Sequence, residues 1–196
     1  MSIQQLFFSI SNRIDDYFKY VTMLLSGEGT NAAQNNTFLD SSSNALALTR
    51  NGNTTQGTFS PYGSNWSNYF NGSSYEVFPL NAAFAIGTAD FTIECWVYVT
   101  NTSPGRSQTV LARHGSSGGT IWIVQILDGG TSRINLAGSV NCTGTTVAAN
   151  TWTHIAFTRS GTSLRAFNNG VLITTVTDST SLSGTQVLTV GSQSDI

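Results

Sequence analysis

The chain has 196 residues and a net charge of −2, and 39% of its residues are hydrophobic, which is enough to form the core of one domain. Charged residues make up only 9%, while serine, threonine and asparagine fill 69 positions, so neutral polar groups must hydrate the surface. One lysine and seven dispersed arginines form no basic patch for nucleic acid or an anionic membrane, and no apolar run approaches the roughly 18 residues that span a bilayer.

Residues 2–21 carry a helical pattern. Apolar side chains recur there at spacings of three and four, which puts them on one stripe of an α-helix: Ile3, Leu6, Phe7, Ile10, Ile14, Tyr17, Phe18 and Val21. Ser2 and Gln5 have the spacing of a capping box at its start. The stripe packs either on this chain's own sandwich or on another protein or copy. Our candidate partner-binding residues are Leu6, Ile10, Ile14, Tyr17 and Phe18.

The rest of the chain carries strand signals. In residues 91–99, apolar residues at the odd positions alternate with a second set at the even positions, which sends the two sets to opposite faces of a sheet. Residues 121–127 form a more uniformly apolar run between glycine pairs and predict a buried strand. Asn169 and Gly170 separate two further strand-like runs, and this dipeptide readily takes the positive φ angles of a tight hairpin turn.

Four segments occur in an order that resembles the laminin-G/concanavalin A-like jelly-roll family: WSNYFNGSSY at 66–75, FTIECWVY at 91–98, WTHIAFTR at 152–159 and LRAFNNG at 164–170. VTMLLSGEGT at 21–30 and FLDSSSN at 38–44 look like the family's first strand and first turn. The resemblance implies an all-β fold, a two-sheet antiparallel jelly-roll sandwich, preceded here by a short N-terminal α-helix. We expect the helix to occupy residues 1–20 and the sandwich residues 21–196.

The C-terminal segment departs from the family pattern. VLTVGSQSD at 187–195 looks like a family strand, after which family members continue into one more strand beside the first. Without that strand the sheet would carry an unpaired edge at residues 21–25, which natural sheets avoid. We therefore expect that the polypeptide continues past Ile196 or that a second subunit pairs with this edge.

No catalytic site is predicted. Glycoside hydrolases of this fold carry paired carboxylates on one strand, whereas Glu28, Glu76 and Glu94 have no partner carboxylate at spacing two or four. Glu94 is expected to pair with an arginine or an amide on the sheet surface. His114 is expected in a solvated turn, and His154 is expected to hydrogen-bond a neighbouring loop.

No cofactor is predicted either, although the resemblance raises calcium as the one alternative. Its ligands would come from Asp40, Asp90 and Asp128, which stand singly, whereas calcium takes six to eight oxygens. Asp40 fits an Asx turn, and Asp90 fits a turn that opens a strand. A glycan platform would draw on aromatic residues at positions where such strands also bury a large ring: Trp66, Tyr69, Tyr75 and Trp122.

The asparagine-, serine- and threonine-rich character of these segments is similar to the marine-bacteriophage branch of the family, where such domains sit in virion and tail-fibre proteins. The resemblance implies a non-enzymatic virion protein made in the host cytoplasm, a tail-fibre or adhesin-type module for host attachment. We expect the chain to contact other virion proteins and to form a homo-oligomer, with a trimer as our guess. Its expected ligand is a host cell-surface glycan. The alternatives are a glycan-binding lectin domain, a head decoration protein or a glycan-cleaving enzyme. Cys95 and Cys142 are then free thiols, because a reducing cytoplasm disfavours disulfides.

Overall fold

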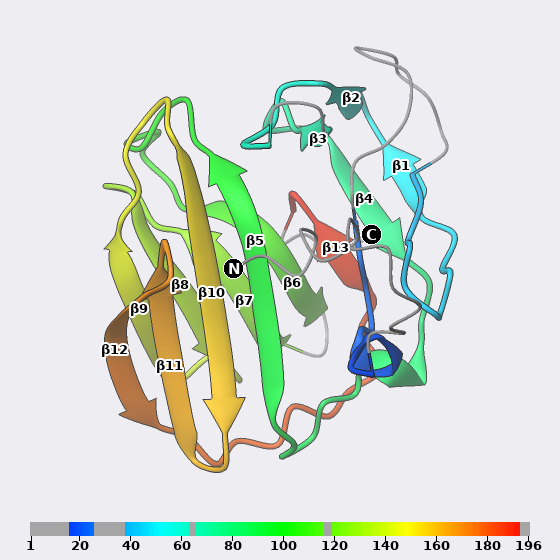
Figure 1. The fold of residues 1–196 in the computed structure, drawn as a ribbon, viewed down its shortest axis with the longest axis vertical. Helices are drawn as coiled ribbons and strands as arrows, with labels where there is room; N and C mark the ends of the chain where they lie inside the picture. Colours follow the sequence, from blue (N-terminus) through cyan, green and yellow to red (C-terminus); the bar gives the residue numbers. More distant parts are fainter. Residues whose placement is uncertain (1–15, 26–37, 63–65, 116–118, 193–196) are drawn as a thin grey trace.

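The computed structural model describes residues 16–25, 38–62, 66–115 and 119–192, which form a sandwich of antiparallel sheets (Figure 1). The larger sheet has seven strands in the spatial order β1 (Thr49–Asn51), β4 (Tyr75–Phe78), β13 (Leu188–Val190), β6 (Gln108–Gly115), β7 (Gly119–Ile126), β8 (Thr131–Leu136) and β9 (Val140–Thr146). The smaller sheet has four, in the order β12 (Val171–Thr177), β11 (Ser163–Asn168), β10 (Trp152–Ser160) and β5 (Phe91–Tyr98). A separate hairpin of β2 (Thr55–Gly57) and β3 (Ser67–Tyr69) lies at the upper end of the sandwich in Figure 1.

The sandwich confirms the predicted all-β class and two of the predicted strands, although β5 lies at the edge of the smaller sheet. Residues 91–98 form β5, which pairs with β10 over eight residue pairs, and the apolar run after Gly119 forms β7. The turn between β11 and β12 has φ values of 48° at Asn169 and 78° at Gly170, as an Asn-Gly hairpin requires. In the described part of the chain after Val21, the one helical segment is the single-turn 3-10 helix η3 (Ala82–Phe84).

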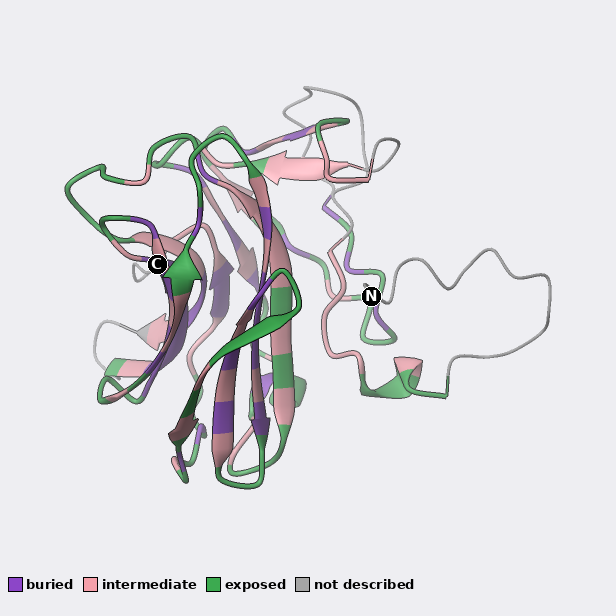
Figure 2. Cartoon of the chain, turned by 60° about the vertical axis from the view of Figure 1, so that its left-hand side comes forward, coloured by how far each residue is buried: buried purple, intermediate pink, exposed green. Residues whose placement is uncertain are grey.

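The core lies between the two sheets, where buried segments of both face each other (Figure 2). The register of the large sheet aligns inward-facing side chains in rows across the strands. One row runs from Phe78 through Leu188 and Arg113 to Trp122 and Leu136. Because every second residue of these strands points inward, the alternate residues form a second surface on the outer face of the sheet.

The N-terminal helix prediction falls mostly on residues 1–15, which lie outside the described residues. The predicted last turn of this helix, up to residue 20, is wrong: Phe18–Tyr20 form only the 3-10 helix η2, and Val21 is extended, with φ −75° and ψ 107°. The chain straightens there because the backbone next pairs with a neighbouring segment. The Ser41 N–H donates to the Leu24 carbonyl at 2.8 Å, and Leu25 forms a single bridge with Asp40. The first strand expected at residues 21–25 is therefore one isolated bridge.

Two buried arginines fasten the chain segments at one end of the sandwich. Arg113 and Arg159 are each only 2% exposed. Arg113 donates from all three guanidinium nitrogens to backbone carbonyls of Phe84, Gly184 and Gln186. Arg159 also uses all three, binding carbonyls of Gly87, Ala89 and Thr180 and the carboxylate of Asp178. These bonds satisfy both cations, which is the condition for burying a charge.

Glu76 occupies an unusual place for a carboxyl group. It is fully buried on β4, in an inward-facing row with Val190, Leu111 and Val124. Neither of its carboxyl oxygens has a hydrogen-bond partner among the described residues. Burial raises the pKa of Glu76 to about 8, so the side chain is largely protonated at neutral pH.

Candidate functional site

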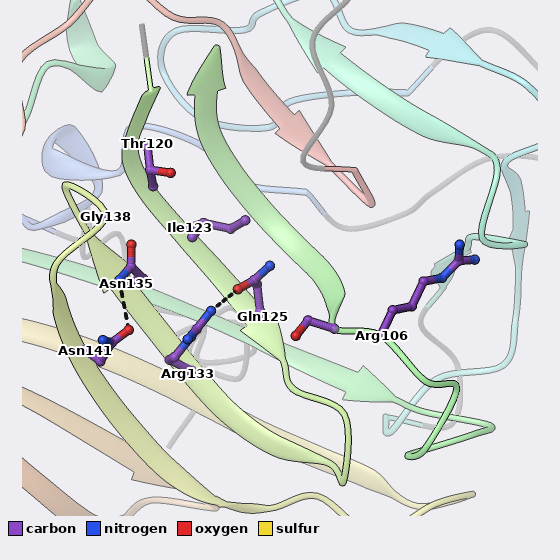
Figure 3. A pocket seen from close by; sticks show the side chains of 9 residues that line it. Arg106, Thr120, Ile123, Gln125, Arg133, Asn135, Gly138 and Asn141 are labelled. Carbon is purple, nitrogen blue, oxygen red and sulfur yellow. Dashed lines mark hydrogen bonds between the residues drawn. The ribbon is translucent and has the colours of Figure 1, made fainter. Parts of the chain in front are cut away.

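A hollow of about 510 Å³ lies on the outer face of the large sheet, over strands β7, β8 and β9 (Figure 3). Nine residues line it: Arg106, Ser107, Thr120, Ile123, Gln125, Arg133, Asn135, Gly138 and Asn141. We call this feature the outer-face hollow. Most of its lining side chains are polar, and none of the nine is acidic.

The register of the sheet builds the floor of the outer-face hollow. Ile123, Asn135 and Asn141 stand in one row across the three strands. Gln125 and Arg133 stand in the next row, two residues further along each strand. Period-two alternation turns both rows away from the core, since the residues between them face inward. Ile123 thus lies at the base of the hollow, where it is only 3% exposed, and the four other side chains surround it with hydrogen-bonding groups.

Two side-chain hydrogen bonds order this floor, as Figure 3 shows. Arg133 Nη2 donates to Gln125 Oε1 at 2.5 Å, and Asn135 Nδ2 donates to Asn141 Oδ1 at 2.8 Å. Gln125 and Asn135 are 5% and 7% exposed, so their rotamers are held by packing as well. Because it donates through Nδ2, Asn135 keeps its carbonyl oxygen as an acceptor. Burial lowers the pKa of the Arg133 guanidinium from its usual value.

Tight turns and a pinned loop form the rim. Ala137 and Gly138 connect β8 to β9 with φ values of 48° and 73°, the paired positive angles of a two-residue hairpin. Arg106 comes from the loop between β5 and β6. The neighbouring Gly105 N–H donates to Asp128 Oδ1 at 3.0 Å, which ties this loop to the β7–β8 turn. This bond fixes the backbone next to Arg106.

The glutamates considered as catalytic residues lie apart from the outer-face hollow. Glu76 faces the core of the large sheet, and Glu94 lies on the outer face of the small sheet. Glu94 Oε2 is 3.5 Å from His154 Nε2, and a hydrogen bond from His154 lowers the pKa of Glu94. The expected partner of Glu94, an arginine or amide, is thus wrong. The loop contact expected for His154 is present through its backbone, since the His154 N–H donates to Asn169 Oδ1 at 2.9 Å in the turn between β11 and β12. His114 lies in strand β6, not in a turn.

The three aspartates considered for calcium serve as hydrogen-bond acceptors in separate turns. Asp40 accepts from the backbone N–H groups of Ser42, Leu24 and Leu46 and from the Ser42 hydroxyl, which confirms the Asx turn. Asp90, which immediately precedes β5, accepts a hydrogen bond from the Gly161 N–H. Among the described residues, no group of three or more His, Cys, Asp or Glu side chains could hold a metal ion. The aspartates do not fit a shared calcium site.

The four aromatic candidates have different positions. Trp122 is 3% exposed and belongs to the core, whereas Tyr69 is 59% exposed. Trp66 and Tyr75 are half-buried. A second aromatic group, which the sequence did not single out, joins Phe59 to Tyr98 and Trp152, with ring centroids 4.7 and 5.4 Å apart.

Three of the candidate partner-binding residues, Leu6, Ile10 and Ile14, lie outside the described residues. Tyr17 is 75% exposed, and Phe18 is half-buried in η2. No helix in the described part of the chain is long and apolar enough to cross a bilayer.

The outer-face hollow itself was missed by sequence reasoning. A signal was present: Gln125 interrupts an otherwise apolar strand, and Arg133 and Asn135 alternate with Ile134 and Leu136. The pattern shows that these polar side chains share a face with one another, but not which strands are neighbours.

Fold and site together describe a lectin-like β-sandwich with a polar hollow on one sheet. Residues 70–195 match the family model described as the concanavalin A-like lectin/glucanases superfamily, and the chain belongs to this family. No curated protein matches the sequence.

Solved structures share the fold at low sequence identity. The binding domain of botulinum neurotoxin DC, in complex with rat synaptotagmin II, is 15% identical with a TM-score of 0.61, over 88% of this chain and 44% of the neurotoxin chain. The serotype G binding domain is 15% identical with a TM-score of 0.63, over 87% and 42%. This chain thus spans less than half the length of those neurotoxin domains. Domain 4 of the arabinanase AbnA from Geobacillus stearothermophilus, in complex with arabinotriose, is 16% identical with a TM-score of 0.58, over 80% and 79%.

Proposed function

We propose that this chain is a non-enzymatic glycan-binding module and that the outer-face hollow is its binding site. The observation that carries the proposal is the floor, where ordered amide and guanidinium groups surround the nearly buried Ile123 side chain. Saccharides present hydroxyls, which donate and accept hydrogen bonds, beside apolar C–H faces. A preformed polar site of this kind binds without first having to order its side chains. Membership of a lectin family and the arabinotriose complex of AbnA domain 4 support the proposal.

The lining also supports binding without cleavage. Glycoside hydrolysis requires two carboxyl groups about 5 to 9.5 Å apart across the scissile bond. None of the nine residues of the outer-face hollow is Asp or Glu. Release of reducing sugar from a bound polysaccharide, persisting in a Glu94→Gln variant, would contradict a purely binding role.

We expect replacement of the amide pair to weaken glycan binding. A glycan array with the purified chain would identify a ligand, and titration calorimetry would then compare the wild type with Asn135→Ala and Asn141→Ala. Each variant loses hydrogen bonds worth about 1 kcal/mol apiece, so the dissociation constant should rise about 5- to 10-fold per variant. Melting curves must show that both remain folded.

Thr175→Ala is the matched control, because Thr175 is an exposed polar residue of β12 on the other sheet. It should bind like the wild type. Unchanged affinity in both asparagine variants would place the ligand elsewhere on the molecule. A failure to bind any saccharide on a broad array would refute the glycan-binding role.

For the biological setting we propose a virion: a tail-fibre or adhesin-type module that displays the sandwich for host-surface attachment, with head decoration as the alternative. Support comes from the resemblance of the Asn/Ser/Thr-rich segments to phage proteins and from a composition with 9% charged residues. Labelling the protein in intact particles tests this setting, because a fibre protein and a head protein occupy different places. Absence from purified particles would contradict it.

The N-terminal stripe is the proposed contact with other virion proteins or with copies of this chain. Replacing both Ile10 and Ile14 by Asp should weaken self-association or particle incorporation at least about tenfold, because a buried unpaired carboxylate is strongly unfavourable. Sedimentation and particle assays measure this effect, with Ser9→Asp/Asn12→Asp as the off-stripe control. Normal assembly of the Ile10/Ile14 variant would show that the stripe is not a partner contact.

A further inference from the structure

Building on the proposed glycan-binding role, we infer that the ligand of the outer-face hollow is an anionic saccharide whose carboxylate or sulfate group pairs with Arg133. The inference starts from the unused hydrogen-bonding capacity of this side chain. Arg133 Nη2 donates to Gln125 Oε1, but its Nε is buried without a hydrogen-bond partner among the described residues. Because the Nε atom itself is closed to solvent, a ligand oxyanion would approach the terminal nitrogens of this half-buried guanidinium and supply a counter-charge there.

Comparison with the two structural arginines makes Arg133 distinctive. Arg113 and Arg159 each donate from all three guanidinium nitrogens to protein acceptors. Arg159 also has the Asp178 carboxylate 2.8 Å from Nη1. Arg133 has one neutral amide acceptor and no ion pair with a described carboxylate. Partial burial of a cation is unfavourable unless an acceptor or counter-charge compensates, and a bound anion would provide both.

The charge distribution around the outer-face hollow favours the same ligand. The chain as a whole has a net charge of −2 and only seven arginines, yet two arginines and no acidic residue line this site. Arg106 is exposed on the rim, where it can attract an approaching anion. A positive recess on a weakly negative protein concentrates anionic ligands and raises their association rate.

The geometry of the group suits an oxyanion on a sugar. A guanidinium presents its N–H groups in a planar fork that matches carboxylate and sulfate oxygens. Asn135 and Asn141 stand in the adjacent row and are bonded to each other, and Asn141 Nδ2 also donates to the Ser139 carbonyl at 3.4 Å. The Asn135 carbonyl oxygen is left to accept a hydrogen bond from a sugar hydroxyl. A uronic acid and a sulfate ester share this chemistry, and they can be separated by experiment.

The test compares saccharides that differ only in charge. Titration calorimetry would use oligogalacturonate against its methyl-esterified form, and a sulfated galactan oligosaccharide against its desulfated form. We expect the charged member of at least one pair to bind at least about tenfold more tightly. This preference should shrink as NaCl rises from about 50 to 500 mM, because salt screens the pairing. The pair that shows the preference identifies the anion.

Arg133→Gln should abolish the preference for the charged saccharide, so that the charged and neutral members of the pair bind this variant with affinities within about twofold of each other. Arg106→Gln should reduce it less, because this side chain lies on the exposed rim. Arg165→Gln is the matched control, since Arg165 lies on β11 of the other sheet. Equal binding of charged and neutral saccharides, or a preference that survives Arg133→Gln, overturns the inference but leaves the glycan-binding role intact. If the wild-type protein binds none of the saccharides, that role is refuted and the inference with it.

Discussion

Replacing Asp178 by alanine is expected to lower the free energy of unfolding by about 3 to 5 kcal/mol, because it leaves the Arg159 guanidinium buried without its counter-charge. The two side chains are 1% and 0% exposed, and Nη1 lies 2.8 Å from Oδ2. Burial alone would raise the pKa of Asp178, but hydrogen bonds from Thr180 and Arg159 hold it below its usual value. Its stabilising contribution is therefore present above the unfolded-state pKa and is lost as the pH falls through the folded-state pKa.

Urea unfolding followed by tryptophan fluorescence would measure this change. Asp90→Ala is the matched control: Asp90 is exposed and accepts one hydrogen bond, from the Gly161 N–H, so its loss should cost about 1 kcal/mol or less. The double variant Arg159→Met/Asp178→Leu should be more stable than Asp178→Ala, since it removes both charges. An Asp178→Ala protein within 1 kcal/mol of the wild type would show that the pair contributes little.

Glu76 should make the protein less stable as the pH rises. Its pKa is raised by burial from 4.5 to about 8, so the folded state resists the loss of its proton. The contribution of Glu76 to stability is therefore fully present below about pH 4.5. It is lost between pH 4.5 and 8, and nothing more is lost to this group above pH 8. At about 1.4 kcal/mol per pKa unit, the loss has an upper limit of about 5 kcal/mol.

Glu76→Leu should flatten this dependence and raise the melting temperature at pH 8, because leucine has no proton to lose and Val190 and Leu111 follow Glu76 in its row. Arg50 stands opposite Glu76 on β1. Thermal unfolding between pH 5 and 8.5 measures the effect. Glu94→Gln is the control: Glu94 is partly exposed, and its pKa is shifted downward, so the loss of stability toward pH 8 should persist in that variant. A wild-type protein whose melting temperature does not fall over this range would contradict the assignment of Glu76 as a protonated core residue.

Local sequence was sufficient wherever a single segment decided the structure. The alternation in residues 91–98 determined strand β5 because one face had to be buried and the other did not. Asn169 and Gly170 determined a hairpin because few other residues tolerate two successive positive φ values. Asp40 determined an Asx turn, because its carboxylate reaches the Ser42 N–H two residues further on.

Local sequence failed where a pattern had to compete with tertiary contacts. The apolar spacing that predicted helix up to residue 21 ends in a 3-10 turn, since the next residues extend to hydrogen-bond with residues 40 and 41. The sequence indicated that Glu94 lies on a sheet surface. It did not show that β10 places His154 opposite Trp96, with its Nε2 atom 3.5 Å from the Glu94 carboxylate.

The sequence by itself determined the class of fold, the strands β5 and β7, the hairpin and the low charge of the surface, because these depend on composition, side-chain period and backbone preference within a few residues. The tertiary structure alone decided the site. Gln125, Arg133 and Asn141 belong to three strands, and only their register makes them neighbours. The tertiary structure also decided the surroundings of individual ionisable side chains. Arg159 has a buried carboxylate partner, Glu76 is buried without a hydrogen-bond partner among the described residues, and Arg133 has one neutral acceptor. The physical reason is that burial and charge pairing depend on which segments pack together, and that is set by long-range contacts.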